Sequence, residues 1–260
     1  MSGDPAYLDY DRVALTYDRR FEGRSEPGTL TALLALARQA GARRVLEVGC
    51  GTGRWLAGLR PITDDLHGLD VSPGMLHQAR KRAGPLLLTR GQAASLPFAS
   101  ASFDLVFCVN AIHHFASPAD WVLQARRVLR SGGVLAVIGS DPRHPQHQWY
   151  AYDYFEDMLD RDLERFPSWG TVLNWMVKAG FVQAEWRPAE HIQHTWCGRQ
   201  VREDPFLEKP ACSQLALLSD QAYDQGIQRI EAAVAAASAA GTTLCFSTSI
   251  WLHMLSGRAP

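Results

Sequence analysis

VLEVGCGTG, at residues 45–53, begins as a short apolar run and ends in three glycines at alternate positions. The apolar run predicts a buried strand at Arg44–Val48. The glycines allow a sharp turn from this strand into a helix at Trp55–Leu59, which Pro61 ends. Ligands of α/β sheets bind at the carboxyl ends of the strands. The turn therefore predicts a ligand site.

Strand-like and helix-like segments alternate on both sides of this loop. Continuous apolarity within the strands, rather than alternation, is typical of a parallel sheet that is covered on both faces. Right-handed crossovers then predict a doubly wound, mostly parallel Rossmann-like sheet with helices on both faces. The further strands are expected at Leu66–Val71, Pro85–Thr89, Phe103–Val109 and Val134–Gly139, and the further helices at Thr29–Ala40, Gly74–Arg82 and Pro118–Leu129.

The pattern changes after residue 140. We expect helices at Ser168–Ala179 and Gln221–Ala240, a strand at Phe181–Pro188 and a last strand at 243–252, while 189–220 looks irregular apart from a helical piece at Ser213–Leu218. We interpret residues 1–140 as a cofactor-binding core with an N-terminal lid helix. Residues 141–260 are expected to complete the same domain with a helical or irregular lid that caps the substrate.

Composition and charge exclude several classes of protein. The chain is 47% hydrophobic and 20% charged, which suits a globular core, and its net charge of −1 lacks the basic excess of nucleic-acid-binding proteins. No apolar stretch approaches 18 residues, and the N-terminus has no secretory apolar region. We therefore expect a cytoplasmic protein with neither a nucleic-acid nor a membrane partner.

Cysteine usage predicts neither a zinc site nor a disulfide framework. The five cysteines are an odd number, and none forms a Cys-x-x-Cys pair. Cys50, Cys108 and Cys245 lie in apolar runs and are expected to be small buried side chains in a reduced protein.

The ligand class follows from the residues around the glycines. A nicotinamide-binding loop would place glycine where Arg54 stands. The acid Glu47 favours a cationic ligand group, such as the amino group of a methionine moiety. The alternative is an ion pair between Glu47 and a nearby arginine or lysine. Asp70, at the end of the second strand, suits both hydroxyls of a ribose. The alternative is that Asp70 caps the next helix, for which Ser72 is better placed.

Four segments, in order, resemble the class I S-adenosylmethionine-dependent methyltransferases, in the small-molecule group that includes the ubiquinone and menaquinone biosynthesis methyltransferases. The resemblance covers about residues 10–140 and implies S-adenosyl-L-methionine as the cofactor. The segments are VLEVGCGTG at 45–53, LDVSPGML at 69–76, GQAASLPF at 91–98 followed by SFDLV at 102–106, and RVLRSGGV at 127–134.

The resemblance implies a cofactor role for each matching position. The glycine loop would line the methionine and the ribose, Asp70 would bind the ribose, and Val71 and Met75 would contact the adenine. The main chain at Asn110 and Ala111 would lie near the methionine amino group. The matching positions are Tyr17, Glu47, Gly49, Cys50, Gly51, Gly53, Asp70, Val71, Met75, Gln92, Ala93, Asn110 and Ala111.

Gln92 departs from the family pattern, and Tyr17 lies in the N-terminal segment. The family often has an aspartate at Gln92 to accept from the adenine amino group, and the Gln92 amide oxygen can still accept there, while Ala93 would donate its main-chain N–H. Tyr17, in a recurring Tyr-Asp pair, would contact the cofactor as part of a lid. The alternative is that Tyr17 anchors an N-terminal helix to the core.

His113 and His114 are the catalytic candidates. They follow the fourth strand, beside the expected substrate cleft, and histidine titrates in the range that a general base requires. Because the pair resembles a family pattern found in enzymes of differing chemistry, a structural or substrate-lining role is favoured over that of a general base. His144 and His147 near Asp141 and Asp153, and the pair His191 and His194, are loose arrangements, so we expect no metal site.

The acceptor is expected to be a small molecule, flat or apolar if the aromatic residues of 149–155 line its site rather than the core. The alanine-rich helix Gln221–Ala240 would either form a homodimer or pack within the monomer. Two other functions stay open. One is methylation of RNA or protein, against which residues 110–113, Asn-Ala-Ile-His, lack a base-methylating motif. The other is a non-catalytic domain that binds the cofactor.

Overall fold

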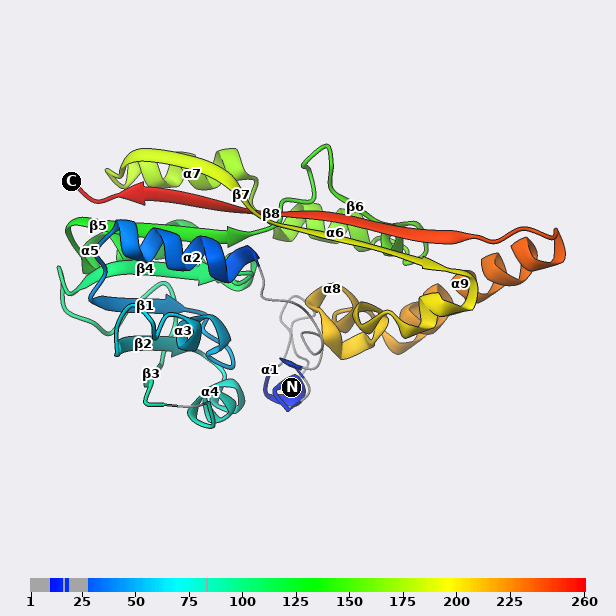
Figure 1. The fold of residues 1–260 in the computed structure, drawn as a ribbon, viewed down its shortest axis with the longest axis horizontal. Coiled ribbons are helices and arrows are strands. Elements are labelled where there is room, and N and C mark those ends of the chain that lie inside the picture. The colour runs from blue at the N-terminus through cyan, green and yellow to red at the C-terminus, as the bar shows by residue number, and fades with distance from the viewer. Residues whose placement is uncertain (1–9, 16, 19–27, 83) are drawn as a thin grey trace.

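The computed structural model describes residues 10–15, 17–18, 28–82 and 84–260, and it confirms the mixed α/β, mostly parallel architecture (Figure 1). One eight-stranded sheet has the order β3-β2-β1-β4-β5-β8-β6, and β7 pairs with β8 beside this path. The first five strands are parallel, and β8 is antiparallel to β5, β6 and β7. The reversal of strand order beside β1 therefore lies where the sequence predicts a ligand site.

The strands are β1 (Arg44–Val48), β2 (Asp65–Asp70), β3 (Leu87–Arg90), β4 (Phe103–Val109), β5 (Leu129–Gly139), β6 (Gln148–Trp149), β7 (Val182–Cys197) and β8 (Cys245–Arg258). The α-helices are α1 (Tyr10–Val13), α2 (Gly28–Gln39), α3 (Arg54–Gly58), α4 (Pro73–Arg80), α5 (Pro118–Val128), α6 (Met158–Arg165), α7 (Trp169–Lys178), α8 (Ser213–Ala216) and α9 (Asp220–Ala239). Short 3-10 turns occur at η2 (Ile112–His114), η3 (Tyr150–Asp153), η4 (Gly198–Glu203), η5 (Pro205–Leu207) and η6 (Lys209–Ala211).

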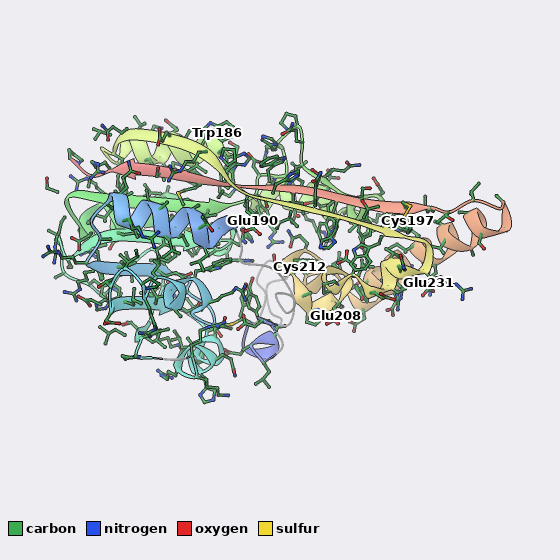
Figure 2. The ribbon with its side chains drawn as sticks, viewed as in Figure 1. Trp186, Glu190, Cys197, Glu208, Cys212 and Glu231 are labelled. Carbon is green, nitrogen blue, oxygen red and sulfur yellow. A yellow bond between two sulfur atoms is a disulfide. The ribbon has the colours of Figure 1, made fainter. Side chains whose placement is uncertain are left out.

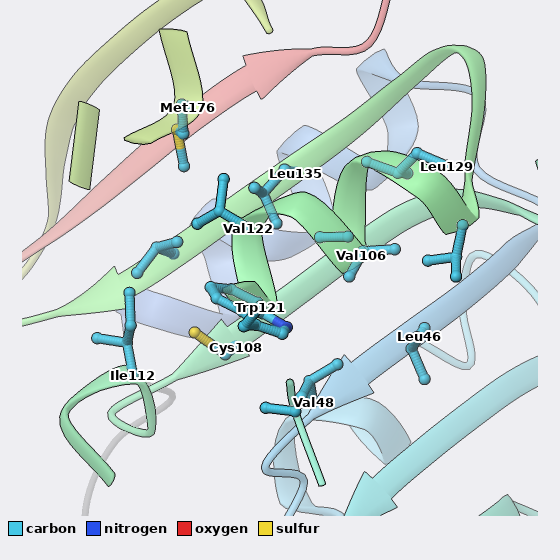
Figure 3. Close-up of a cluster of buried hydrophobic side chains, with 14 of the residues drawn as sticks. Leu46, Val48, Val106, Cys108, Ile112, Trp121, Val122, Leu129, Leu135 and Met176 are labelled. Atoms are coloured by element: carbon cyan, nitrogen blue, oxygen red, sulfur yellow. The ribbon is translucent and has the colours of Figure 1, made fainter. Parts of the chain in front are cut away.

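Two apolar clusters cover the two faces of the sheet. One lies under α5 and α7, where Trp121 is fully buried against β4 and β5 (Figure 3). The other lies under α2 and α3 and contains Leu33 and Leu56. The predicted cap of α4 is confirmed, because the Ser72 hydroxyl accepts from the N–H of Met75 over 3.0 Å. Among the described helices, none is both long and apolar enough to cross a bilayer.

The β7–β8 ribbon corrects the prediction for the second half of the chain. Residues 189–197 were expected to be irregular, but they continue β7 and pair in register with β8, from Glu190↔Leu252 to Cys197↔Cys245. Figure 1 shows β8 running from the edge of the sheet to the neighbourhood of α9. Most side chains of β7 are exposed or half-buried, so the strand lacks the apolar pattern by which buried strands are predicted.

A third apolar cluster joins the aromatic segment to the distal end of the ribbon. Phe155 and Phe246 are buried in it, and Gly226 of α9 lies against the Phe155 ring, so close that a Cβ there would meet a ring carbon at 2.2 Å. One side of α9 therefore packs within the monomer, while the predicted homodimer stays a prediction.

A disulfide between Cys197 and Cys245 corrects the cysteine prediction. These residues are partners across the register of β7 and β8, a pairing that cysteine spacing cannot indicate. Cys245, expected to be buried, is exposed. Cys50, Cys108 and Cys212 are free and buried.

We predict that unfolding the chain without a reductant exposes three alkylatable thiols, because Cys197 and Cys245 are already bonded to each other. Prior reduction should raise the number to five. Mass spectrometry of the alkylated chain checks the counts, and a digest should contain one linked pair of peptides. Five modified thiols without reduction would contradict the disulfide.

Asp162 of α6 is expected to make stability depend on pH. Burial raises the pKa of this carboxyl from 3.8 to about 6, although the Tyr152 hydroxyl donates to it over 2.8 Å and Arg165 lies beside it. The folded chain then binds this proton more tightly than the unfolded chain does. Its contribution to the free energy of unfolding should fall by about 2–3 kcal/mol as the pH rises from below 3.8 to above about 6.

The Asp162→Asn variant should lose this dependence, because an amide keeps an acceptor for Tyr152 but does not ionise. Urea unfolding of the variant and of the wild type at several pH values measures the difference. Asp160→Asn, at an exposed position of the same helix, is the control. A difference in stability between Asp162→Asn and the wild type that stays constant with pH contradicts the prediction.

Candidate functional site

Two neighbouring cavities lie at the carboxyl ends of the parallel strands. The smaller has a volume of about 470 Å³, and the larger, of about 690 Å³, extends under the β7–β8 ribbon. Both volumes are in the range of small-molecule sites. Tyr10, Tyr17, Asn110 and His114 line both cavities and therefore mark the place where they meet.

The smaller cavity brings together most of the residues that the sequence analysis singled out. The predicted residues that line it are Tyr17, Gly49, Gly51, Asp70, Val71, Met75, Gln92, Ala93, Asn110, Ala111 and His114. Glu47, Cys50 and Gly53 belong to the same loop but do not line this cavity, and His113 lines only the larger one.

Gly49 and Gly51 have positive φ angles, which residues with a side chain adopt only at an energetic cost. Gly49 has φ 71°, and a Cβ there would lie 2.7 Å from the Cβ of Ala111. Gly51 has φ 51°, and a Cβ there would meet no protein atom within 4 Å. Gly51 therefore leaves free space at the wall of the smaller cavity, which a ligand can approach.

Asp70 is held rigidly at the end of β2. Its Oδ2 accepts from the N–H of Gly51 over 2.8 Å, and its Oδ1 accepts from the N–H of Ser72 over 2.9 Å. Burial raises the pKa of Asp70, and these hydrogen bonds oppose the shift. Because Ser72 itself caps α4, Asp70 is left facing the cavity with lone pairs that can still accept.

Glu47 lies behind the loop. Its Oε2 accepts from the N–H of Leu56 over 3.0 Å, which ties β1 to the start of α3, and its Oε1 has no hydrogen-bond partner within the described ranges. Burial raises the pKa of Glu47 well above its usual value. Among the described residues, no arginine or lysine forms an ion pair with Glu47. Its contact with a methionine amino group stays a prediction.

Cys50 and Gly53 also support the loop from behind. A Cβ on Gly68 of β2 would lie 2.8 Å from Cys50 Sγ, so this thiol points toward β2. Gly53, with φ 71°, precedes α3, and a Cβ there would lie 2.9 Å from a methyl group of Leu86.

The opposite wall of the smaller cavity is apolar. Val71 is exposed and Met75 is buried, and both follow Asp70 in the chain. Gln92 and Ala93, after β3, complete this wall. A flat heterocycle suits such a surface, with the Gln92 amide available at its edge.

Tyr17 lies at the junction of the cavities, while the next residue fixes the N-terminal segment to the glycine loop. The Thr52 hydroxyl donates to Asp18 over 2.8 Å, and the guanidinium of Arg82 pairs with the same carboxylate. Tyr17 therefore stands beside both cavities on a segment that is attached to the loop, as a lid contact requires.

The two adjacent histidines have different surroundings. His114 Nε2 and the Tyr10 hydroxyl share a hydrogen bond of 2.7 Å at the junction of the cavities. The His113 ring stacks on Phe166 with 3.8 Å between ring centres. Burial and the neighbouring His114 lower the pKa of His113 well below its usual value. Of the two candidates, His114 is therefore the one placed between both cavities.

Tyr10 and Glu190 are site residues that the sequence does not predict. Tyr10 is 104 positions from its partner His114, and only the folded chain brings them together. Glu190 lies in the part of β7 expected to be irregular and lines the larger cavity. A lone tyrosine and a lone glutamate carry no spacing signal from which either role could be predicted.

The aromatic segment 149–155 contributes side chains both to the larger cavity and to the apolar core. Trp149 and Tyr152 line the larger cavity, whereas Phe155 is buried in the third apolar cluster. The Tyr150 hydroxyl donates to Asp204 over 2.7 Å. Among the residues that the structure describes, no three His, Cys, Asp or Glu side chains gather as metal ligands would.

Sequence relatives match about half of this chain. A family model described as "Methyltransferase domain" matches residues 46–137. The 2-methyl-6-phytyl-1,4-hydroquinone methyltransferase 2 of Oryza sativa subsp. japonica, a chloroplastic protein, is 34% identical over 142 residues, which cover 53% of this chain and 38% of that protein. The demethylmenaquinone methyltransferase of Chlorobaculum parvum is 29% identical over 164 residues, which cover 56% of this chain and 68% of that protein.

Solved structures share the fold over most of the chain. A putative methyltransferase from an antibiotic biosynthesis pathway of Anabaena variabilis superposes with a TM-score of 0.66 at 18% identity, over 88% of this chain and 95% of that one. The chain therefore covers well under half of the length of the first of these two sequence relatives. Residues 46–137, which hold the glycine loop and Asp70, are thus identified as a methyltransferase domain, and the chain shares its fold with the Anabaena protein.

Proposed function

We propose that the protein transfers a methyl group from S-adenosyl-L-methionine, bound in the smaller cavity, to a small-molecule acceptor bound in the larger one. The observation that carries this proposal is the junction of the cavities at Tyr10, Tyr17, Asn110 and His114. When bound, the cofactor supplies an electrophilic methyl group on a sulfonium. Two adjoining sites allow a nucleophile to be aligned with that group.

The residues of the smaller cavity fit this cofactor. Asp70 would accept from the ribose hydroxyls, and Val71 and Met75 would contact the adenine, with Gln92 accepting from its amino group. Gly49 and Gly51 would allow the main chain to approach the methionine and the ribose. Asn110, with φ 49°, would present its carbonyl near the methionine amino group.

The larger cavity supports an aromatic or apolar acceptor. Rings from several elements line it, among them Trp55, Trp149, Tyr152 and Phe166. Two relatives are named as methyltransferases of a phytylated hydroquinone and of demethylmenaquinone, both acceptors with a flat ring. We propose the same broad class of acceptor here.

His114 and Tyr10 would accept the proton of a hydroxyl acceptor. The Tyr10 oxygen would take that proton while the hydroxyl proton of Tyr10 passes along the 2.7 Å hydrogen bond to His114 Nε2. The methylated acceptor would be a neutral ether, and the proton held by His114 would return to solvent. His113, stacked on Phe166, would shape the acceptor site.

Two measurements test the proposal. Calorimetry should detect binding of S-adenosylhomocysteine to the full chain, and a tritiated methyl donor should label a metabolite extract. Absence of binding would overturn the assignment of the cofactor. Binding without transfer to any fraction would favour a non-catalytic role, and labelling of RNA or protein alone would favour a macromolecular acceptor.

A further inference from the structure

The described residues that line the larger cavity include two carboxylates, Glu190 and Asp204, and no lysine or arginine. Burial lowers the pKa of His113 and His147, the latter to about 4, so these two rings are neutral at neutral pH. His114, His191 and His194 also line the cavity. The described wall therefore offers carboxylates and imidazoles, without the permanent positive charge of a lysine or arginine.

Glu190 stands on the face of the ribbon that borders the cavity. Side chains alternate along a strand, so Glu190, Ile192 and His194 share one face of β7. Their register partners Leu252, Ile250 and Thr248 also line the cavity, as do His191 and Gln193 of the same strand. In Figure 2 the labelled Glu190 lies beneath the ribbon, on the side toward Cys212.

Among the described residues, hydrogen-bond donors contact one oxygen of Glu190. Its Oε2 accepts from the N–H of Thr29 over 3.1 Å and from the Thr29 hydroxyl over 2.7 Å. Throughout the described ranges, no donor contacts Oε1. The carboxylate of Glu190 lies at the N-terminus of the twelve-residue helix α2, and Thr29 fixes its orientation. Glu190 is thus an oriented acceptor with a free oxygen.

Asp204 differs from Glu190 in this respect. Its Oδ2 accepts from the Tyr150 hydroxyl over 2.7 Å, and its Oδ1 accepts from the N–H of Phe206 over 2.9 Å. Both oxygens already have partners, and the residue is buried. Of the two carboxylates, Glu190 is the one available to a ligand.

We infer that the acceptor carries a basic nitrogen, which binds in its protonated form to Glu190. The inference rests on the proposed function, because it assigns the larger cavity to the acceptor. An ammonium group forms a charge-assisted hydrogen bond with a carboxylate. Tyr10 and Tyr17, which line the same cavity, supply aromatic rings that attract cations. An acceptor with a carboxylate or phosphate would instead be repelled.

Three isosteric probes test the inference without requiring catalysis. The full chain, loaded with S-adenosylhomocysteine, is titrated with naphthylmethylamine, naphthylmethanol and naphthoate, which differ in charge but little in shape. The amine should bind about 10-fold more tightly than the alcohol, as expected for a hydrogen bond to a charged group, and the naphthoate most weakly. Naphthoate binding as tightly as the amine overturns the inference on the wild-type protein alone.

A variant then assigns the preference to its residue. Glu190→Gln should bring the affinity for the amine to that for the alcohol, while the amide oxygen still accepts from Thr29. Glu185→Gln, at an exposed position of β7 outside the cavity, is the matched control and should keep the full preference. An amine preference that persists in Glu190→Gln overturns the inference.

The cofactor measurement separates this inference from the proposed function. Affinity for S-adenosylhomocysteine should be the same in the wild type and in Glu190→Gln, because Glu190 does not line the smaller cavity. If S-adenosylhomocysteine fails to bind the wild type, the proposed function fails. If it binds but the probes show no preference for the cation, only the inference about the acceptor fails.

Discussion

Replacing Asp70 by alanine is expected to weaken binding of S-adenosylhomocysteine by about 10²–10⁴-fold. The two hydrogen bonds that its carboxylate would accept from the ribose hydroxyls are each worth about 1.5–3 kcal/mol, and about 1.4 kcal/mol corresponds to a factor of ten. The variant also removes the acceptor of the Gly51 and Ser72 N–H groups, which loosens the glycine loop. Calorimetry of the purified variant measures the loss.

Two further variants show whether this loss comes from the carboxylate itself. Asp70→Asn keeps one acceptor oxygen and should lose less affinity than Asp70→Ala. Asp64→Ala, at an exposed position just before β2, should bind as the wild type does. Wild-type affinity in Asp70→Ala would remove Asp70 from the cofactor site.

Replacing His114 by phenylalanine is expected to lower kcat by about 10²–10⁴-fold for a hydroxyl acceptor, the usual contribution of a general base. Tyr10→Phe should lower kcat in the same direction, because it removes the hydroxyl that is bonded to His114 but keeps the ring. Affinity for S-adenosylhomocysteine should change little in Tyr10→Phe. Initial rates with the acceptor found by tritium labelling measure both effects.

The dependence of kcat on pH distinguishes a base from a structural residue. In the wild type the rate should fall toward acid pH, and this fall should disappear in His114→Phe. His77→Phe, at an exposed position of α4, is the control for adding an aromatic ring. An unchanged kcat in His114→Phe would show that the nucleophile reacts without help from this histidine.

The parallel half of the fold was predictable because its signals are local. β1 and β4 begin and end where their apolar runs do, and Ser72 caps α4 where the Ser-Pro pair predicts. Each of these signals lies within a few residues of the element that it specifies. The predicted cofactor residues gather around one cavity for the same reason, since they follow successive parallel strands.

The ribbon was not predictable, because it is held by contacts between distant residues. His194 and Thr195 are exposed, so the sequence around them lacks an apolar period, and β7 forms there because β8 supplies its hydrogen-bond partners. The Cys197–Cys245 bond, over a separation of 48 residues, depends on that register. The division of the chain at residue 140 stays a prediction.

The continuous course of β8 gives the wall of the larger cavity a mechanical property. Its C-terminal half, from His253 to Arg258, pairs with β5, while its N-terminal half, from Cys245 to Leu252, leaves β5 and pairs with β7 and, at Thr248 and Ser249, with β6. At about 3.3 Å per residue this half is roughly 25 Å long, so a tilt of about 5° where it leaves β5 would move its tip by about 2 Å. The Cys197–Cys245 bond joins β7 to β8 at that tip, and Phe246 joins the tip to the third apolar cluster. Such a tilt would therefore move β6, the ribbon and that cluster together rather than β8 alone.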